Sequence, residues 1–356
     1  MAEEMRRLLA AVHGGVRETR VGVRLRRLRA AWRLRPAHTS DFESRLVWIV
    51  GSPRTGSSWL LRMLASHGRV VAIDEPQIGW YLGPFVSDLP GGSADDLDLS
   101  NFTLRVLQRD RAAQFFAETF AAVWAPQLGR LIRERFYAHA RLFPAQDTSA
   151  PSLVVIKEPN GSQSIDVLMR AVPRARLLFL LRDGRDVVDS ELAANLPDSW
   201  VTREFPGLRG IPEAERLNFV VQSAHKWLWR TEIVQRTCDR YPSQSHLVRY
   251  EDLVADPAGQ LGGILDWLGL ACTSQELESC VERYAFQRIS AGVTGPTEFF
   301  RSGQPGAWRT NLRADEQAAL ERILGPTLRG LGYERSGPVE ARATEPVAEY
   351  QAATPS

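Results

Sequence analysis

The sequence contains few cysteines and very few lysines. Its three cysteines, Cys238, Cys272 and Cys280, cannot all pair with one another and are not spaced as metal ligands. Such usage suits a reducing compartment and argues against a zinc site. Lys157 and Lys226 are the only lysines among 44 basic residues, which is most simply a coding bias toward arginine. A lysine kept against that bias is a candidate for a specific role.

Long apolar runs and a strong charge imbalance are also missing. No segment approaches the length of a transmembrane helix and the N-terminus lacks the apolar core of a signal peptide, so we expect a cytoplasmic protein. The formal net charge is only +2, so total charge gives no argument for a nucleic-acid partner, and we expect none. With 356 residues, 44% of them hydrophobic, the chain can form one large α/β domain or two small ones.

The most informative stretch, residues 46–64, combines a strand, a turn and a helix. Its first five residues are almost uniformly apolar, which is typical of a strand buried on both faces of a parallel sheet. Gly51 and Gly56 bracket the turn, and Ser57 and Ser58 stand where the first amides of a helix need partners. Such a helix N-terminus predicts a phosphate site, although a plain tight connection would have the same pattern.

The turn matches the phosphate loop of nucleotide triphosphatases in spacing but lacks its lysine. In the pattern G-x-x-x-x-G-K-[ST], Gly51 and Gly56 fit, whereas Ser57 takes the lysine position and Ser58 follows it. In the triphosphatases that lysine contacts the β and γ phosphates, and the next hydroxyl holds magnesium. Arg54 is the only cation in this turn. The loop therefore suits phosphate binding but is poorly equipped to transfer the γ-phosphate of ATP.

Four further apolar runs follow, separated by segments with helical periodicity. They cover residues 70–73, 153–156, 176–181 and 245–249, and each ends in charged or polar residues. This alternation predicts an α/β fold with a central parallel five-stranded sheet flanked by helices, of the P-loop nucleotide-binding type, with helical insertions. Ligands of such sheets bind beyond the carboxyl ends of the strands. We therefore expect a set of charged residues to meet at that edge: Arg54, Glu75, Lys157 and Arg182.

The two ends of the chain differ from its middle. Residues 1–40 are rich in arginine and carry apolar residues at helical spacing, which predicts a basic amphipathic helix. The helix either packs on the domain, which the pattern favours, or mediates peripheral membrane binding, self-association or contact with another partner. Residues 336–356 are rich in Ala, Pro, Thr and Glu and are predicted to form a disordered tail.

Two segments between the strands are expected beside the site. Residues 102–143 have a helical pattern and form an insertion, and residues 197–212 form a polar loop placed over the site. One face of the insertion is apolar, and we assign most of it to the core and a few of its residues to the wall of a substrate pocket. That face consists of Phe116, Phe120, Val123 and Trp124.

Three separated motifs resemble those of the sulfotransferase family that uses 3′-phosphoadenosine 5′-phosphosulfate (PAPS). Residues 53–59 (PRTGSSW) resemble its 5′-phosphosulfate loop, residues 181–190 (LRDGRDVVDS) its 3′-phosphate motif, and residues 301–308 (RSGQPGAW) the late loop that closes on the nucleotide. The string YEDL at 250–253 also recurs in that family. The motifs occur in the family's order, and the resemblance implies a sulfotransferase domain over residues 45–335.

The resemblance implies that one group of residues binds the donor, with 3′-phosphoadenosine 5′-phosphate (PAP) as product. The group is Arg54, Thr55, Gly56, Ser57, Ser58, Trp59, Arg182, Ser190, Arg301, Ser302 and Gly303. Residue chemistry agrees, because a donor with 5′ and 3′ phosphates needs an anion site at each end of its nucleoside. Ser302 stands where relatives often carry lysine, so that contact is weaker. The donor has no γ-phosphate to neutralise, and we expect no metal.

The catalytic residues implied by the resemblance are Glu75, Lys157 and Arg54. An acceptor hydroxyl attacks sulfur in line, with positioning and charge stabilisation supplying most of the catalysis. Glu75 is assigned as general base because the branches that act on protein tyrosine have a glutamate after the second strand. The small-molecule cytosolic branch uses a histidine where this chain has Pro159. Lys157 is implied to stabilise the bridging oxygen of the leaving group, and Arg54 to contact the phosphosulfate.

Several alternatives stay open at this point. A P-loop kinase acting on a small alcohol or nucleoside would require ATP and magnesium, and a non-catalytic nucleotide-binding scaffold would not need Glu75 or Lys157. His67 and His225 are weaker base candidates, which we assign to a helix end and to the core. Aromatic residues near the site allow a phenol, a lipid alcohol, a sugar or an antibiotic-like metabolite as acceptor. We favour a small molecule or a glycolipid.

Overall fold

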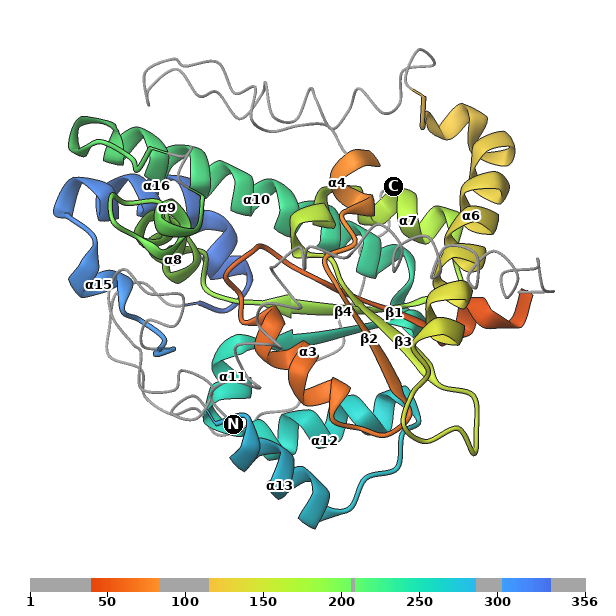
Figure 1. Cartoon of the computed structure of the whole chain (residues 1–356). Helices are drawn as coiled ribbons and strands as arrows, with labels where there is room; N and C mark the ends of the chain where they lie inside the picture. The colour runs from red at the N-terminus through yellow and green to blue at the C-terminus, as the bar shows by residue number, and fades with distance from the viewer. Residues whose placement is uncertain (1–39, 83–114, 206–208, 286–302, 334–356) are drawn as a thin grey trace, which may run out of the picture.

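A computed structural model describes residues 40–82, 115–205, 209–285 and 303–333 (Figure 1). Several predictions fall outside these residues: the N-terminal basic helix, the part of the insertion before residue 115, Arg301 and Ser302 of the late loop, and the C-terminal tail. Within the described parts of the chain, no helix is long and apolar enough to cross a membrane.

Five parallel strands form the centre of the fold, in the order β2-β3-β1-β4-β5. They are β1 (Leu46–Val50), β2 (Val70–Asp74), β3 (Leu153–Lys157), β4 (Arg176–Leu181) and β5 (Ser245–Arg249). The predicted five-stranded parallel α/β fold is confirmed. The chain crosses β1 when it passes from β3 to β4, and a crevice for ligands forms at the carboxyl ends of strands where the strand order reverses in this way.

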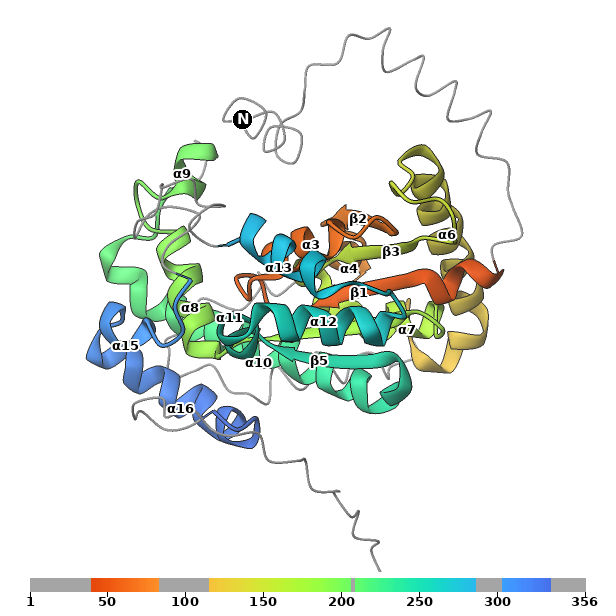
Figure 2. The same cartoon turned by 90° about the horizontal axis from the view of Figure 1, so that it is seen from below.

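Helices cover both faces of the sheet (Figure 2). Successive residues of β1 point to opposite sides and are all apolar, so each face of the sheet has to be buried. Leu46, Trp48 and Val50 belong to one buried cluster, and Val47 and Ile49 belong to another. The first cluster is completed by α6 (Ala121–Leu142), α7 (Ile165–Ala171), α8 (Gly184–Ala194), α10 (Arg216–Arg240), α15 (Trp308–Asn311) and α16 (Ala314–Gly330). The second is completed by α3 (Ser57–Ala65), α11 (Tyr250–Ala255), α12 (Pro257–Leu268) and α13 (Ser274–Arg283).

Shorter helical segments connect these elements. Two of them, α4 (Ile78–Leu82) and α9 (Trp200–Glu204), contribute residues to the candidate site described below. The others are 3₁₀ helices: η1 (Ser40–Arg45), η3 (Glu118–Phe120), η4 (Pro159–Ser164), η5 (Glu213–Glu215) and η6 (Pro242–Gln244). Helix α9 corrects the sequence interpretation of residues 197–212, because the segment is not entirely loop. The Ser199 hydroxyl caps α9 by accepting a hydrogen bond from the Thr202 N–H.

The apolar face assigned to the insertion is also corrected. Helix α6 begins at Ala121, so Phe120 precedes the helix and is 45% exposed, and Val123 points outward with 69% exposure. Trp124 is buried and Phe116 is partly buried against it, so only these two of the four side chains contact the core. The inward face of α6 has helical spacing and shares only Trp124 with the predicted face. It consists of Ala121, Trp124, Ala125, Gly129, Ile132 and Phe136.

Candidate active site

The turn after β1 depends on two glycines. Gly51 has a φ of 141°, and a Cβ atom there would lie 2.2 Å from the carbonyl oxygen of Leu180. Gly56 has a φ of 87°, and its Cβ would lie 2.6 Å from the ring of Tyr250. The Ser162 hydroxyl fixes the start of the turn, donating to the Gly51 carbonyl at 2.6 Å and accepting from the Gly51 N–H at 3.0 Å. Any larger residue at either glycine would displace the turn.

The N-terminus of α3 differs from the sequence interpretation. Gly56 is the N-cap, no side chain caps the first turn, and Ser57 and Ser58 are the first helical residues rather than caps. The Ser58 hydroxyl instead accepts a hydrogen bond from Lys157 Nζ at 2.7 Å. The buried Thr55 hydroxyl donates to the Ser52 carbonyl at 2.9 Å and so shapes the turn from inside. An uncapped first turn leaves N–H groups that an anionic ligand can accept from.

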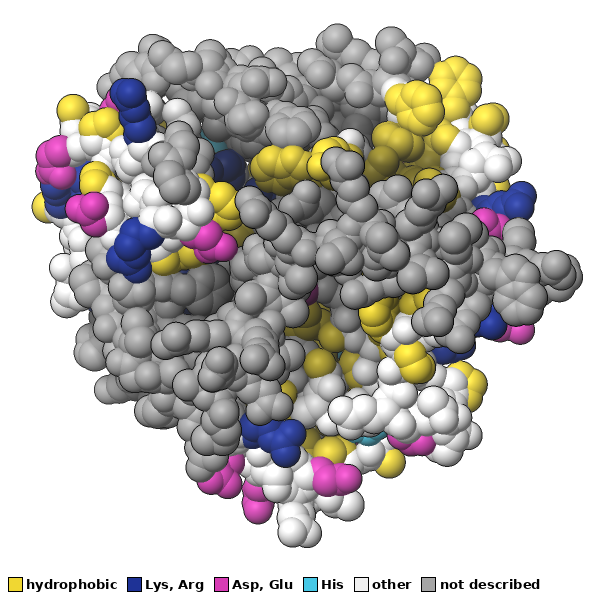
Figure 3. Space-filling model, viewed as in Figure 1, with side chains coloured by type: hydrophobic (Ala, Val, Ile, Leu, Met, Phe, Trp, Pro, Cys, Tyr) yellow, Lys and Arg dark blue, Asp and Glu magenta, His cyan; other side chains and the backbone are white. Residues whose placement is uncertain are grey.

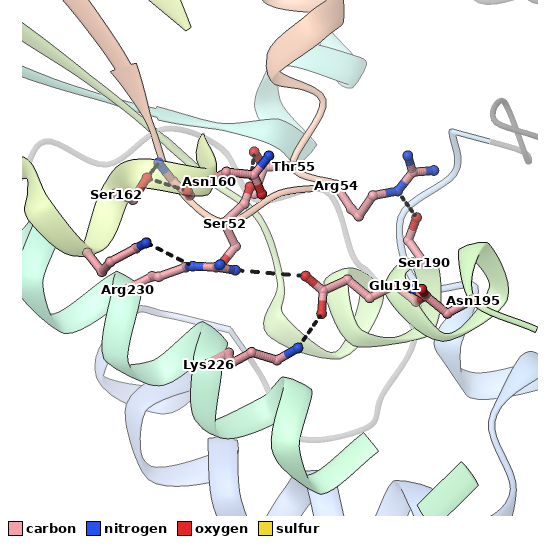
Figure 4. A network of polar contacts seen from close by, with 12 residues as sticks. Ser52, Arg54, Thr55, Asn160, Ser162, Ser190, Glu191, Asn195, Lys226 and Arg230 are labelled. Carbon is pink, nitrogen blue, oxygen red and sulfur yellow. Dashed lines mark hydrogen bonds and ion pairs between the residues drawn. The ribbon is translucent and has the colours of Figure 1, made fainter. Parts of the chain in front are cut away.

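The two predicted anion sites are in direct contact with each other (Figure 4). Arg54 Nε donates to Ser190 Oγ at 3.1 Å, and Arg182 Nη1 donates to the Arg54 carbonyl at 2.9 Å. The Arg182 guanidinium also lies over the Tyr250 ring, 4.3 Å from its centroid. Arg54 has a φ of 68°, a conformation that costs a non-glycine residue roughly 1–3 kcal/mol and is found mostly where a site needs it. The 5′ loop is therefore positioned by the 3′ motif.

The described part of the late loop is fixed beside the same site. Tyr250 donates its hydroxyl hydrogen to the Gly303 carbonyl at 2.7 Å. The N–H groups of Gly306 and Trp308 donate to the two carboxylate oxygens of Asp186, at 2.7 and 3.3 Å. Burial raises the pKa of Asp186, and these N–H groups and Arg182 oppose that shift. The third motif thus contacts the second motif through Asp186, as a nucleotide site built from both would require.

Lys157 joins the loop to the end of β2. Its buried Nζ lies 2.7 Å from Ser58 Oγ, 2.7 Å from Asp74 Oδ1 and 2.8 Å from Glu75 Oε1. The second Glu75 oxygen accepts a hydrogen bond from Asn160 Nδ2 at 2.8 Å. The structure therefore brings Glu75 and Lys157 together. Sequence reasoning gave no role to Asp74 or Asn160, although Asp74 ends β2 and Asn160 lies three residues after β3.

The other predicted and considered residues lie around this cluster. Trp59 Nε1 donates to the Tyr284 carbonyl at 2.9 Å, and the Trp59 ring meets Tyr250 edge-on at 6.4 Å. His67 follows α3, and its Nε2 lies 3.1 Å from the Ala271 carbonyl oxygen. His225 is buried in α10, and burial lowers its pKa. Neither histidine contacts Lys157 or Glu75.

Glu158 is an unusual buried acid directly after Lys157. Its side chain is fully buried, and neither carboxyl oxygen makes a hydrogen bond of good geometry with described residues. The N–H groups of Gln77, Ile78 and Gly79 lie near enough to lower its pKa, but burial and the neighbouring Glu75 charge outweigh them and raise the pKa of Glu158 to about 8. The carboxyl group is therefore protonated at neutral pH.

Replacing this acid should change how stability depends on pH. In the native protein Glu158 holds its proton up to about pH 8, whereas in the unfolded chain it ionises near 4.5, so the stability it contributes is lost as pH rises between these values. Glu158→Gln cannot ionise. Between pH 5 and pH 7 we expect the free energy of unfolding of the variant to rise by about 2 kcal/mol relative to that of the native chain. Urea unfolding at both pH values measures this, and parallel pH dependences would contradict it.

A cavity of about 420 Å³ lies beside Arg54. Aromatic residues from three elements line it: Trp80 of α4, Trp200 of α9 and Phe219 of α10. Asn160, which is hydrogen-bonded to Glu75, also lines it, so one hydrogen bond connects the cavity wall to the Lys157 cluster. On the face shown in Figure 3, apolar side chains gather beside a recess in which basic side chains are visible. An apolar cavity with a few convergent polar groups is the usual form of a small-molecule site.

The chain belongs to the sulfotransferase family, whose model matches residues 47–274. This confirms the family resemblance, and the first two motifs lie within the matched residues, whereas the late loop at 301–308 lies beyond them. The omega-hydroxy-beta-dihydromenaquinone-9 sulfotransferase Stf3 of Mycobacterium bovis is 24% identical over 62% of this chain and 48% of its own length. Carbohydrate sulfotransferase 7 of the mouse is 28% identical over 38% of this chain and 29% of its own length. The chain thus spans about half the length, or less, of these two relatives.

Other matches cover a larger share of the matched protein. A putative protein-tyrosine sulfotransferase of Caenorhabditis briggsae is 22% identical over 83% of this chain and 91% of its own length. Among solved structures, mouse sulfotransferase SULT7A1 complexed with PAP is 12% identical with a TM-score of 0.49, and the match covers 80% of this chain and 84% of that one. Sulfotransferase STF9 of Mycobacterium avium is 18% identical with a TM-score of 0.45, covering 83% and 78%.

Proposed function

We propose that this chain transfers the sulfuryl group of PAPS to a hydroxyl of a small molecule or glycolipid. Family membership supports the class of reaction. The observation that carries the proposal is the position of Lys157, whose ammonium contacts Ser58 of the donor loop and Glu75 beyond β2 at the same time. A group in this position can act on donor and acceptor together.

Donor binding would use both anion sites. The uncapped N-terminus of α3 and Arg54 suit the 5′-phosphosulfate, and Arg182 with Ser190 suits the 3′-phosphate. The buried Tyr250 ring packs against Arg182, and its hydroxyl donates to the Gly303 carbonyl, so Tyr250 joins the second motif to the late loop. No step of this scheme requires a metal, and the absence of a metal requirement stays a prediction.

Transfer would proceed by in-line displacement at sulfur. Glu75 takes the proton of the acceptor hydroxyl while the acceptor oxygen forms a bond to sulfur. The bond between sulfur and the bridging oxygen breaks, and its electron pair leaves on the 5′-phosphate of PAP. The Lys157 ammonium stabilises the charge that develops on that oxygen. A positioned base contributes about 10²–10⁴-fold in rate.

The relatives are named for omega-hydroxy-beta-dihydromenaquinone-9, carbohydrate and protein tyrosine. Because these names differ in acceptor, the cavity beside Arg54 is the better guide to this chain's acceptor. Its aromatic lining favours a ring or an apolar surface next to the reacting hydroxyl. We assign the acceptor to this cavity because Asn160 connects it to Glu75.

The direct test uses PAPS labelled at sulfur. The full chain is incubated, in the presence of a chelator, with a panel of phenols, sugars and lipid alcohols, and transferred label is counted. We expect label on at least one hydroxyl acceptor and a transfer rate at least about 100-fold lower when Glu75→Gln replaces the native chain. Transfer of phosphate from Mg·ATP to an acceptor would instead support the kinase alternative. PAP binding without any transfer, over the whole panel, would support the scaffold.

A further inference from the structure

We propose that the acceptor carries an oxyanion, a carboxylate or a phosphate, which Lys226 and Arg230 bind in the cavity beside Arg54. The inference rests on the proposed function, because it assigns the cavity to the acceptor. Lys226, one of the two lysines of the sequence, then has a specific role in selecting the acceptor.

The two cations lie one helical turn apart on α10 and face the same cavity. Lys226 Nζ lies 3.9 Å from one oxygen of Glu191, and Arg230 Nη1 lies 3.9 Å from the other. Both separations exceed hydrogen-bond length. Figure 4 shows the Glu191 side chain, which comes from α8, lying between the two cations of α10. The carboxylate therefore attracts two charges without binding either of them tightly.

Positive charge exceeds negative charge on the α10 side of the cavity. Among the described residues of the lining, Glu191 is the one carboxylate, and it faces both Lys226 and Arg230. Only 6% of the Arg230 side chain is exposed, and burial lowers the pKa of Arg230. A buried charge without full compensation is costly, and that cost is relieved when an opposite charge enters. An anionic acceptor would supply it.

Arg230 also has hydrogen-bond donors to spare. A guanidinium carries five N–H donors in a planar fork that matches a carboxylate or a phosphate. With the described residues Arg230 makes one hydrogen bond, from Nε to Gln163 Oε1, and it is long at 3.4 Å. Lys226 Nζ contacts the face of the Phe219 ring, 5.4 Å from its centroid, in addition to Glu191. Donors that converge on a cavity and are weakly engaged are suited to an anionic ligand.

The arrangement also gives the acceptor a direction. Asn160 lines the cavity from η4, where it is hydrogen-bonded to Glu75, whereas Lys226 lines it from α10 (Figure 4). An acceptor with its anion at Lys226 and Arg230 would present its hydroxyl toward Asn160 and Glu75. The aromatic residues of the lining would then contact the body of the acceptor.

The test compares acids with neutral analogues of the same shape. The full chain, saturated with PAP so that the donor sites are filled, is titrated calorimetrically with 4-hydroxyphenylacetate, 4-hydroxyphenyl phosphate and methyl 4-hydroxyphenylacetate. We expect at least one acid to bind 10-fold or more tightly than the ester, and the better acid identifies carboxylate or phosphate. Equal affinities, or no binding by either acid, would overturn the proposal.

Two variants separate anion binding from a structural role. Lys226→Met should weaken acid binding about 10-fold and leave the ester unchanged, whereas Glu191→Gln, which removes the competing carboxylate, should strengthen acid binding. If both variants shift acid affinity in the same direction, or neither shifts it, the pair of cations is only structural. A calorimetric titration with PAP, made before the acids are added, tests the donor site separately. Acid preference without PAP binding would refute the proposed function alone. PAP binding without acid preference would refute this inference alone.

Discussion

Glu75→Gln is expected to lower kcat about 10²–10⁴-fold while PAP binding stays unchanged. The amide cannot accept the acceptor proton, but it can keep the local contacts. Its oxygen can face Lys157 and its NH₂ group can donate to Asn160 if the Asn160 amide turns over. Sulfate transfer at saturating PAPS and calorimetric titration with PAP measure the two effects.

Asp74→Asn is the matched control for this variant. Asp74 and Glu75 both contact Lys157, at 2.7 and 2.8 Å, and the side chains of both are about one-third exposed. Each substitution therefore removes one carboxylate charge that contacts the same Lys157 ammonium. We expect Asp74→Asn to lower kcat less than 10-fold, because only Glu75 is hydrogen-bonded to Asn160 at the cavity. The reverse order of effects would make Asp74 the base.

Lys157→Met is expected to lower kcat about 10²–10³-fold, the usual loss when one group that stabilises developing charge is removed. Methionine retains roughly the length of the side chain and its packing in β3, but it lacks the positive charge that would stabilise the bridging oxygen. The chain should still fold, because the two carboxylates that lose their partner are partly exposed to water. A thermal melt beside the transfer assay separates folding from catalysis.

Ser58→Ala serves as the control for Lys157→Met. It removes one contact of the ammonium and leaves the contacts with Asp74 and Glu75 in place. We expect less than a 10-fold loss of kcat. Lys157→Met activity within threefold of the native chain would remove Lys157 from the mechanism, whatever the effect of Ser58→Ala.

The sheet could be predicted because its strands are buried on both faces. In that environment every position is apolar, so a run such as Leu46–Val50 is visible in the sequence without an alignment. Helix starts are harder to predict, since a single cap position decides them. Gly56 rather than Ser57 caps α3, and α6 begins after Phe120, which turns Phe120 and Val123 outward.

The site was predictable as far as strand ends determine it. Parallel strands bring their carboxyl ends to one edge, and the contacts of Arg54 with Arg182 and of Glu75 with Lys157 lie there. The roles of these residues remain predictions. The cavity was not predictable, because its charge depends on how α10 packs against α8 and brings Lys226 to Glu191 across 35 residues of sequence. Nor does periodicity reveal that Glu158 is buried and makes no hydrogen bond of good geometry with the residues that the structure describes.

The most direct test of the account is a calorimetric comparison of PAP with adenosine 5′-phosphate in the presence of a chelator. If Arg182 and Ser190 form a second anion site, the 3′-phosphate should tighten binding about 100-fold, as expected for two charge-assisted hydrogen bonds. That advantage should shrink in Arg182→Met and in Ser190→Ala, and it should disappear when both substitutions are combined. Equal binding of the two nucleotides, or binding that requires magnesium, would contradict the account.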